Sequence, residues 1–217
     1  MAEAGETLMM QAVIFDCDGV LIDSERLMTN VLHQSLAKFD LTLSQAEIDE
    51  NIVGQTTEVF QAYIAKRFGE TLSQKFYIEH NQSVNHAFSN DLVLIDGIES
   101  LLQSIDLPLA CASNSGTASL ANKLKITQLN RYFDVVVAAQ DVQKPKPYPD
   151  VYLKAASELG VEPKKCWVVE DSPIGMQAGA NANMQVIGFH RDQQVKKYGA
   201  QVVFDKMSDI EAFLQSQ

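Results

Sequence analysis

The stretch VIFDCDGVLIDSE, residues 13–25, decides the expected fold. A short apolar run, residues 12–15, passes directly into Asp16 and Asp18 and then into Gly19. A continuous apolar run of this kind is typical of a strand buried on both faces of a parallel sheet. Side chains alternate along a strand, so Asp16 and Asp18 should point the same way. The sequence therefore predicts a buried strand that ends in two carboxylates.

Two interpretations of this aspartate pair are open at this point. In open α/β sheets, ligands bind at the carboxyl ends of the strands, and a divalent cation would offset the repulsion between two neighbouring carboxylates. Alternatively, both side chains cap the turn before Gly19. Because D-x-D is a short motif with many chance matches, its spacing does not choose between the two.

Composition excludes several classes of partner. The chain has 217 residues, is 46% hydrophobic and carries a net charge of −11. It is long enough to bury a core. Its acidity argues against nucleic acid and anionic membranes, which bind basic surfaces. No apolar run approaches the ~18 residues of a spanning helix, and the N-terminus lacks a signal-peptide pattern. Three cysteines without metal-ligand spacing are expected as buried free thiols, so a cytoplasmic protein is expected.

The apolar pattern predicts two domains. Residues 23–93 have apolar residues at helical spacing and hold no convincing strand, so they are expected to form an all-helical cap. From Gly97 onward, helical stretches alternate with apolar runs at residues 109–112, 135–138, 167–169, 186–189 and 202–204. This alternation predicts a doubly wound, mostly parallel α/β core formed by residues 11–22 and 94–217. A cap inserted after the first strand is expected to lie above the aspartates as a lid.

Polar residues follow three further predicted strands. Ser113 and Asn114 precede a helix expected to begin near Thr117 and would suit an anion, although, taken alone, an ordinary helix cap is the better explanation of these two residues. The loop KPKPYPD, residues 144–150, could hold a lysine toward the same edge. Glu170 and Asp171 form a second acidic pair at a strand end. Together, these residues suit a site for a hard cation and a phosphate.

These motifs, in this order, resemble those of the haloacid dehalogenase superfamily, and most closely its phosphatase and mutase branch with a small helical cap. The similarity spans about residues 11–190. The residues that carry it are Asp16-Cys17-Asp18-Gly19-Val20, Ser113-Asn114, Lys146-Pro147-Tyr148-Pro149-Asp150 and Glu170-Asp171-Ser172. The resemblance implies a Mg²⁺-dependent enzyme that acts on a small phosphorylated metabolite through an aspartyl-phosphate intermediate.

The resemblance also implies a role for each matching residue. Asp16 would be the nucleophile, and Asp18 would protonate the leaving oxygen and then activate water. Mg²⁺ would be bound by Asp16, by the backbone carbonyl of Asp18 and by Asp171, with Glu170 acting directly or through water. The phosphate would be held by Ser113 and Asn114, and its charge balanced by Lys146.

One position departs from the family pattern. Pro145 stands where the family commonly has glycine, so a stiffer loop is expected. Lys146 is preferred to Lys144 because only Lys146 stands in the K-P-x-P-D frame, although Lys144 could replace it.

Alternative functions come from related proteins. β-Phosphoglucomutase is the nearest rival, but the positions of its histidine, lysine and arginine correspond to Met28, Val53 and Thr57 in this sequence, so a clamp for a second phosphate is not expected. A receiver-like switch also accepts phosphate on an aspartate, yet it would explain neither the D-x-D spacing nor the helical insertion. The dehalogenase branch would explain neither Asp18 nor the second acidic pair.

The cap offers only candidates for substrate recognition. Gly54, Gln55 and Thr56 form a polar loop, and Glu25 stands at the hinge. They could bind sugar hydroxyls, or they could simply form a turn and a helix cap. The resemblance to sugar phosphatases of this branch implies a sugar phosphate or a phosphorylated sugar acid as the substrate, and a monomer is the expected state.

Overall fold

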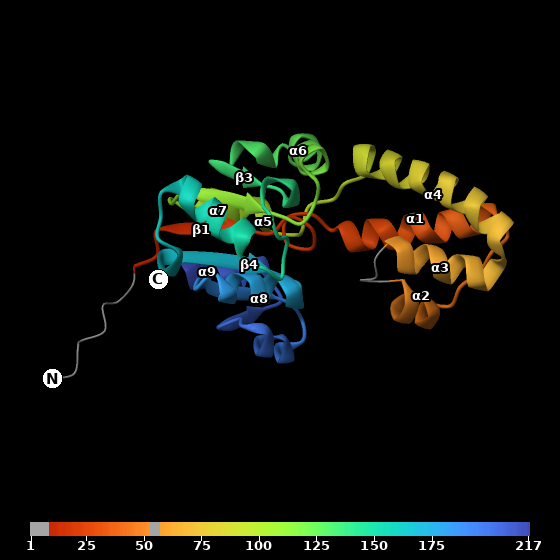
Figure 1. Cartoon of the computed structure of the whole chain (residues 1–217). Helices are drawn as coiled ribbons and strands as arrows, with labels where there is room; N and C mark the ends of the chain where they lie inside the picture. The colour runs from red at the N-terminus through yellow and green to blue at the C-terminus, as the bar shows by residue number, and fades with distance from the viewer. Residues whose placement is uncertain (1–8, 53–56) are drawn as a thin grey trace. The chain divides into compact units, whose positions relative to one another are not determined.

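The computed structural model describes residues 9–52 and 57–217. Contacts divide the chain into two compact units (Figure 1). One unit contains the N-terminal segment up to Ser24 together with Val93–Gln217, and the other is Glu25–Leu92.

A six-stranded parallel sheet forms the centre of the first unit, which confirms the predicted doubly wound core. Its strand order is β3-β2-β1-β4-β5-β6. The strands are β1 (Ala12–Phe15), β2 (Leu109–Ala112), β3 (Val135–Val137), β4 (Cys166–Glu170), β5 (Gln185–Phe189) and β6 (Val202–Phe204). Strands β2 and β3 lie on one side of β1, and β4, β5 and β6 lie on the other. The strand order therefore reverses at β1, and open α/β sheets bind ligands at such a switch point.

Three strands have bounds that differ from the predicted runs, and one of them is β5, which begins at Gln185 and not at residue 186. β3 ends before Ala138, whose backbone N–H leaves the ladder and donates to Asp141 Oδ2 at 2.8 Å, at the start of the 3₁₀ helix η2 (Ala139–Asp141). β4 is longer than residues 167–169, because Cys166 pairs with β1 and Glu170 pairs with β5. The extra residue at the carboxyl end keeps the backbone of Glu170 inside the sheet.

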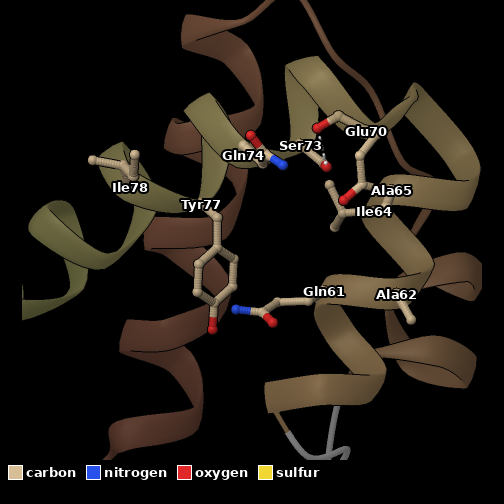
Figure 2. A pocket seen from close by; sticks show the side chains of 9 residues that line it. All are labelled: Gln61, Ala62, Ile64, Ala65, Glu70, Ser73, Gln74, Tyr77 and Ile78. Atoms are coloured by element: carbon tan, nitrogen blue, oxygen red, sulfur yellow. Dashed lines mark hydrogen bonds between the residues drawn. The ribbon is translucent and has the colours of Figure 1, made fainter.

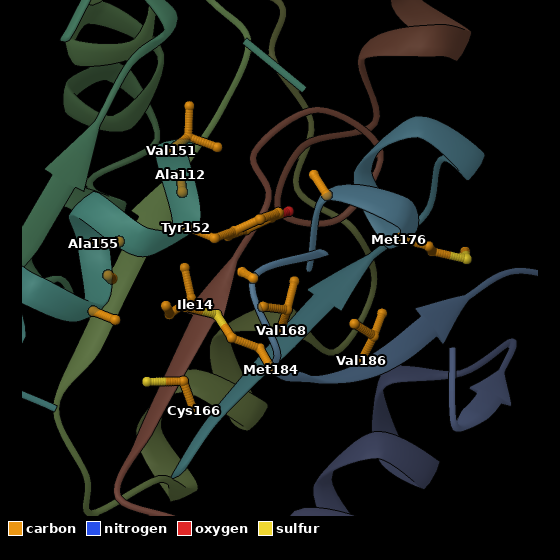
Figure 3. Close-up of a cluster of buried hydrophobic side chains, with 14 of the residues drawn as sticks. Ile14, Ala112, Val151, Tyr152, Ala155, Cys166, Val168, Met176, Met184 and Val186 are labelled. Carbon is orange, nitrogen blue, oxygen red and sulfur yellow. The ribbon is translucent and has the colours of Figure 1, made fainter. Parts of the chain in front are cut away.

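Helices cover both faces of the sheet. They are α5 (Ile98–Ser104), α6 (Thr117–Ile126), α7 (Asp150–Leu159), α8 (Pro173–Asn181) and α9 (Met207–Leu214), with 3₁₀ turns η1 (Leu129–Arg131), η3 (Pro163–Lys165) and η4 (Gln193–Tyr198). α7 contacts β1, β2 and β3, and α8 contacts β4 and β5. Ile14 and Val168 face these two helices in one buried cluster (Figure 3). The neighbouring residue Trp167 points to the other face, where its ring lies 5.1 Å from that of Phe213 on α9.

In the part that the structure describes, the second unit consists of helices joined by turns and loops, with no strand. Its helices are α1 (Ser24–Lys38), α2 (Gln45–Asn51), α3 (Thr57–Phe68) and α4 (Glu70–Asn90). Its core consists of Leu32, Leu36, Leu43, Ile48, Ile64 and Phe76. The buried His80 ring stacks on Phe76 with 5.5 Å between centroids, and its Nδ1 lies 3.0 Å from Ser35 Oγ.

α3 and α4 also border a hollow of about 530 Å³ (Figure 2). Polar side chains, including Gln61, Gln74 and Tyr77, line it beside Ile64 and Ile78. None of the catalytic candidates lines this hollow.

The segments before and after the helical unit pair with each other. Asp23 N–H donates to the Val93 carbonyl at 2.9 Å, and Ile95 N–H donates to the Leu21 carbonyl at 3.1 Å. Ile22 and Leu94 form an antiparallel bridge. The chain segment that leads into the helical unit and the segment that leads out of it are thus paired with each other directly after β1.

Two further expectations concern composition. Cys17, Cys111 and Cys166 are all buried and free, as expected. Among the residues that the structure describes, no helix combines the length and apolar character needed to cross a membrane.

Candidate active site

A tight turn at the end of β1 carries the two aspartates. Gly19 N–H donates to the Ile22 carbonyl at 2.8 Å, and Ile22 N–H donates back to the Cys17 carbonyl at 3.1 Å. Gly19 has φ +83°, and a Cβ there would lie 1.9 Å from Asp171 Oδ2. Both the backbone conformation and the approach of Asp171 therefore require glycine at this position.

Asp16 lies beside the acidic pair at the end of β4. Because Phe15 pairs with Val169 and Asp16 N–H donates to the Val169 carbonyl at 3.0 Å, Asp16 is level with Glu170. Asp16, Glu170 and Asp171 each offer a carboxylate oxygen within 4.8 Å of the others. This spacing allows one cation to contact several of them.

Lys146 joins two of these carboxylates. Its Nζ lies 2.5 Å from Asp16 Oδ1, 2.7 Å from Glu170 Oε1 and 3.0 Å from the Ala112 carbonyl. Its side chain is only 3% exposed. Lys144 instead lies over the ring of the exposed Tyr148, 4.7 Å from the centroid. The structure thus brings Lys146, and not Lys144, to Asp16.

The burial of this pair affects both partners. Burial raises the pKa of Asp16 to about 7, with Lys146 acting in the opposite direction and Glu170 adding repulsion. Burial also disfavours the charged form of Lys146, but Asp16 and Glu170 outweigh it and hold the pKa of Lys146 well above its usual value. Lys146 is therefore cationic, and a second cation held by the cluster would lower the pKa of Asp16 as Lys146 does.

Glu170 is completely buried, and both of its oxygens are engaged. Oε1 accepts from Lys146 Nζ and from the Tyr152 hydroxyl, the latter at 2.8 Å. Oε2 accepts from the backbone N–H and the hydroxyl of Ser172, each at 3.0 Å. A Cβ on Gly175 would lie 1.7 Å from Oε1, so a glycine makes room for this carboxylate. These contacts fix Glu170 in one orientation.

The residues after β2 hold neighbouring loops. Asn114 Oδ1 accepts from Lys146 N–H at 2.9 Å, and Asn114 Nδ2 donates to the Lys146 carbonyl at 3.3 Å. Both polar atoms of Asn114 thus contact the backbone that carries Lys146. Ser113 is buried, and its hydroxyl oxygen accepts from Ser115 N–H at 3.0 Å. The predicted contacts of Ser113 and Asn114 with phosphate remain predictions.

The carboxylate of Asp18 has partners that the sequence did not suggest. Lys123 Nζ donates to Oδ1 at 2.7 Å and to Oδ2 at 2.6 Å, and the Ser115 hydroxyl donates to Oδ2 at 2.9 Å. Sequence reasoning missed Lys123 and Tyr152, and it noted Ser115 only as a polar donor after the second strand, with no contact to Asp18. A signal existed for Lys123, which stands between Leu120 and Leu124 on the buried side of α6, where an apolar residue is expected.

Four predicted binding residues cannot be placed with the others. Gly54, Gln55 and Thr56 lie outside the described residues, and so does the side chain of Glu25. Their proposed contacts with substrate remain predictions.

The carboxylates and lysines of the first unit suit a hard cation. Asp16, Asp18, Glu170 and Asp171 bring four carboxyl groups to the described part of the first unit, against the two ammonium groups of Lys123 and Lys146, so acidic groups outnumber basic ones. An excess of negative charge with oxygen ligands is the environment that Mg²⁺ prefers.

Comparisons of the sequence identify a family and a curated relative. A family model described as "Haloacid dehalogenase-like hydrolase" matches residues 13–189. The chain is 30% identical over 190 residues to the 6-phosphogluconate phosphatase of Escherichia coli strain K12, an alignment that covers 86% of each chain.

Solved structures share the fold over nearly the whole chain. A haloacid dehalogenase family hydrolase from Deinococcus radiodurans, with bound phosphate and sodium, has a TM-score of 0.84 at 28% identity and covers 96% of each chain. A haloacid dehalogenase-like protein of unknown function from Agrobacterium tumefaciens has a TM-score of 0.81 at 29% identity, over 95% of this chain and 98% of that chain.

Proposed function

Because this chain belongs to the haloacid dehalogenase-like hydrolase family, we propose that it is a Mg²⁺-dependent phosphatase that forms an aspartyl phosphate on Asp16. The contact between Asp16 and Lys146, beside Asp171 and the fixed Glu170, is the observation that carries this proposal. The buried carboxylate of Asp16 thus lies next to the ammonium of Lys146 and next to carboxylate oxygens that could bind a metal cation. A site that receives a phosphoryl group needs this arrangement.

The first step transfers the phosphoryl group to the enzyme. A carboxylate oxygen of Asp16 attacks phosphorus, and the bond from phosphorus to the substrate oxygen breaks. Asp18 gives its proton to that oxygen, so the alcohol leaves neutral and Asp18 becomes a carboxylate.

The second step releases phosphate. The Asp18 carboxylate removes a proton from water, and the water oxygen attacks phosphorus. The bond between phosphorus and Asp16 breaks, which returns Asp16 to a carboxylate and Asp18 to its protonated form.

The acidic cluster fits Mg²⁺. Asp16, the backbone carbonyl of Asp18 and Asp171 would hold it, with Glu170 acting through water because its oxygens already accept four hydrogen bonds. When bound, Mg²⁺ would supply positive charge to the carboxylates and to the phosphate.

The remaining polar residues would orient the phosphate. Lys146 would stabilise the charge that develops between Asp16 and phosphorus. Ser113 would donate its hydroxyl to a phosphate oxygen, and Asn114 would keep Lys146 in place while its backbone contributes to the phosphate site.

Similarity to known phosphatases supports the proposed substrate class. The E. coli relative is named for 6-phosphogluconate, so we propose a sugar phosphate or a phosphorylated sugar acid. Selection between them is assigned to the helical unit, with Glu25, Gly54, Gln55 and Thr56 as candidates. We expect a monomeric cytoplasmic enzyme with no nucleic acid or membrane partner.

Phosphate release from a panel of sugar phosphates and sugar acid phosphates tests this proposal. Release by the wild type with Mg²⁺ should stop on chelation and in Asp16→Asn, whereas Asp106→Asn, at an exposed aspartate before β2, should keep the activity. Interconversion of glucose phosphate isomers without release would favour a mutase. Stable labelling of Asp16 without turnover would favour a switch.

A further inference from the structure

Lys123 is a buried lysine on the apolar side of a helix. It is 6% exposed and stands with the buried Leu120 and Leu124 on α6. Lysine is almost never buried in this way without a charged partner, because removal of the ammonium from water is costly. The partner here is Asp18, which contacts Lys123 through both carboxylate oxygens.

Ser115 completes the contacts of this carboxylate. Its hydroxyl donates to Asp18 Oδ2, and Lys123 Nζ lies 3.1 Å from Ser115 Oγ. The turn after β1, the loop after β2 and helix α6 thus meet at one carboxylate. Asp18 itself keeps 31% of its side chain exposed, so it is held from one side and open on another.

We propose that Lys123 is a positioning residue that aims Asp18 for proton transfer to the leaving oxygen. The inference rests on the proposed function, in which Asp18 is the acid of the first step. The ammonium fixes the side-chain rotamer of Asp18, and it stabilises the carboxylate that remains once the proton has moved.

The hydrogen bonds also identify the oxygen that carries the proton. Within the described residues, Oδ2 accepts from both Ser115 and Lys123, so its two lone pairs are used. Oδ1 accepts from Lys123 and keeps one lone pair. The proton therefore goes from Asp18 Oδ1 to the substrate oxygen. At the same time, the bond between that oxygen and phosphorus breaks, and the bond between phosphorus and Asp16 forms.

Substrates with different leaving groups distinguish the positioning role of Lys123 from a purely structural role. A sugar alkoxide is a poor leaving group and needs its proton, whereas 4-nitrophenolate leaves readily without one. The ratio kcat/KM covers only the steps up to release of the alcohol, so hydrolysis of the intermediate does not enter it. If Asp18 is no longer oriented toward the leaving oxygen, kcat/KM for a sugar phosphate should therefore fall, whereas kcat/KM for 4-nitrophenyl phosphate should change little.

The test compares kcat/KM for these two substrates in Lys123→Met, with the best-hydrolysed sugar phosphate of the panel as the alkyl substrate. We expect a loss of about 10- to 100-fold on the sugar phosphate, part of what a general acid contributes, and a much smaller loss on 4-nitrophenyl phosphate. Asp18→Asn should show the same selectivity more strongly, and Lys123→Arg should restore much of the activity on the sugar phosphate.

Two further variants keep the inference falsifiable if Lys123→Met folds poorly. Ser115→Ala removes one donor to the same carboxylate and should show the same selectivity at a smaller size. Lys125→Met makes the same change at an exposed position of α6 and should leave both substrates unaffected.

Equal losses on both substrates, or no loss, would overturn the positioning role while the phosphatase activity of the wild type stands. A wild type that releases phosphate from neither substrate overturns the proposed function and this inference with it.

Discussion

The Lys146 ammonium lies 2.5 Å from Asp16 Oδ1 at the carboxyl end of β1, in a position almost closed to solvent. Lys146 also contacts Glu170 on β4 and the carbonyl of Ala112 on β2. One lysine from the loop before α7 therefore joins three adjacent strands. In the proposed reaction, it is the fixed positive charge beside the attacking carboxylate.

Replacement of this lysine tests the electrostatic part of the account. Lys146→Met should lower kcat by about 100-fold or more, because a fixed charge beside the reacting group is removed. Lys144→Met is the matched control, since Lys144 lies over the exposed Tyr148. Steady-state kinetics on both variants checks the prediction. A large loss in Lys144→Met with little change in Lys146→Met would reverse the assignment.

Gly19 tests the approach of Asp171 to the turn after β1. Gly19→Ala should raise the Mg²⁺ concentration needed for half-maximal activity, because the new Cβ would occupy the place of Asp171 Oδ2. Gly160→Ala is the control: its φ is +71°, but nothing lies within 4 Å of a Cβ there. That variant should lose only about 1 kcal/mol of stability from backbone strain. Equal Mg²⁺ requirements in the two variants would show that the contact with Asp171 does not matter.

Tyr152 tests the fixed orientation of Glu170. Tyr152→Phe keeps the ring in the buried cluster of Figure 3 but removes the hydroxyl that donates to Glu170 Oε1. The free energy of unfolding should fall by about 1.5–3 kcal/mol, the contribution of a hydrogen bond to a charged group. Denaturant unfolding measures it, with Tyr148→Phe at an exposed tyrosine as the control. An unchanged stability would mean that the other contacts of Glu170 suffice.

His80 predicts how the stability of the helical unit depends on pH. Burial lowers the pKa of His80 from 6.5 to about 4, so between these values the unfolded chain binds a proton that the folded chain does not. Stability should therefore fall as the pH drops through this range, by roughly 2 kcal/mol between pH 7 and pH 5 from this residue alone.

Denaturant unfolding at these two pH values, with amide exchange of α4 to report the helical unit, measures the effect. His80→Gln should remove this part of the pH dependence, whereas His33→Gln, at an exposed position of α1, should keep it. The same pH dependence in His80→Gln and wild type would assign the effect to other groups.

Much of the sheet could be predicted from the sequence, because its strands are short apolar runs separated by helical stretches. The site followed from the same pattern: parallel strands place their carboxyl ends at one edge, so Asp16, Ser113 and Glu170 were expected near one another. The identity of the lysine beside Asp16 also agreed with its sequence frame.

The partners of individual polar atoms could not be predicted. Lys123 reaches Asp18 from the body of a helix, and spacing along the chain does not indicate where a long flexible side chain ends. The two hydrogen bonds between the Asn114 side chain and the backbone of Lys146 were not expected either. Such pairings depend on how loops from different strands pack, which the pattern of a single strand does not contain.

The covalent intermediate on Asp16 is the most direct test of the account. Rapid-quench mass spectrometry with a hydrolysed sugar phosphate and Mg²⁺ should find one phosphoryl group on the peptide that contains Asp16. That group should form no more slowly than the alcohol is released and decay at the rate of phosphate release. A phosphoryl group on another residue, none during turnover, or one that decays more slowly than turnover would contradict the proposed mechanism.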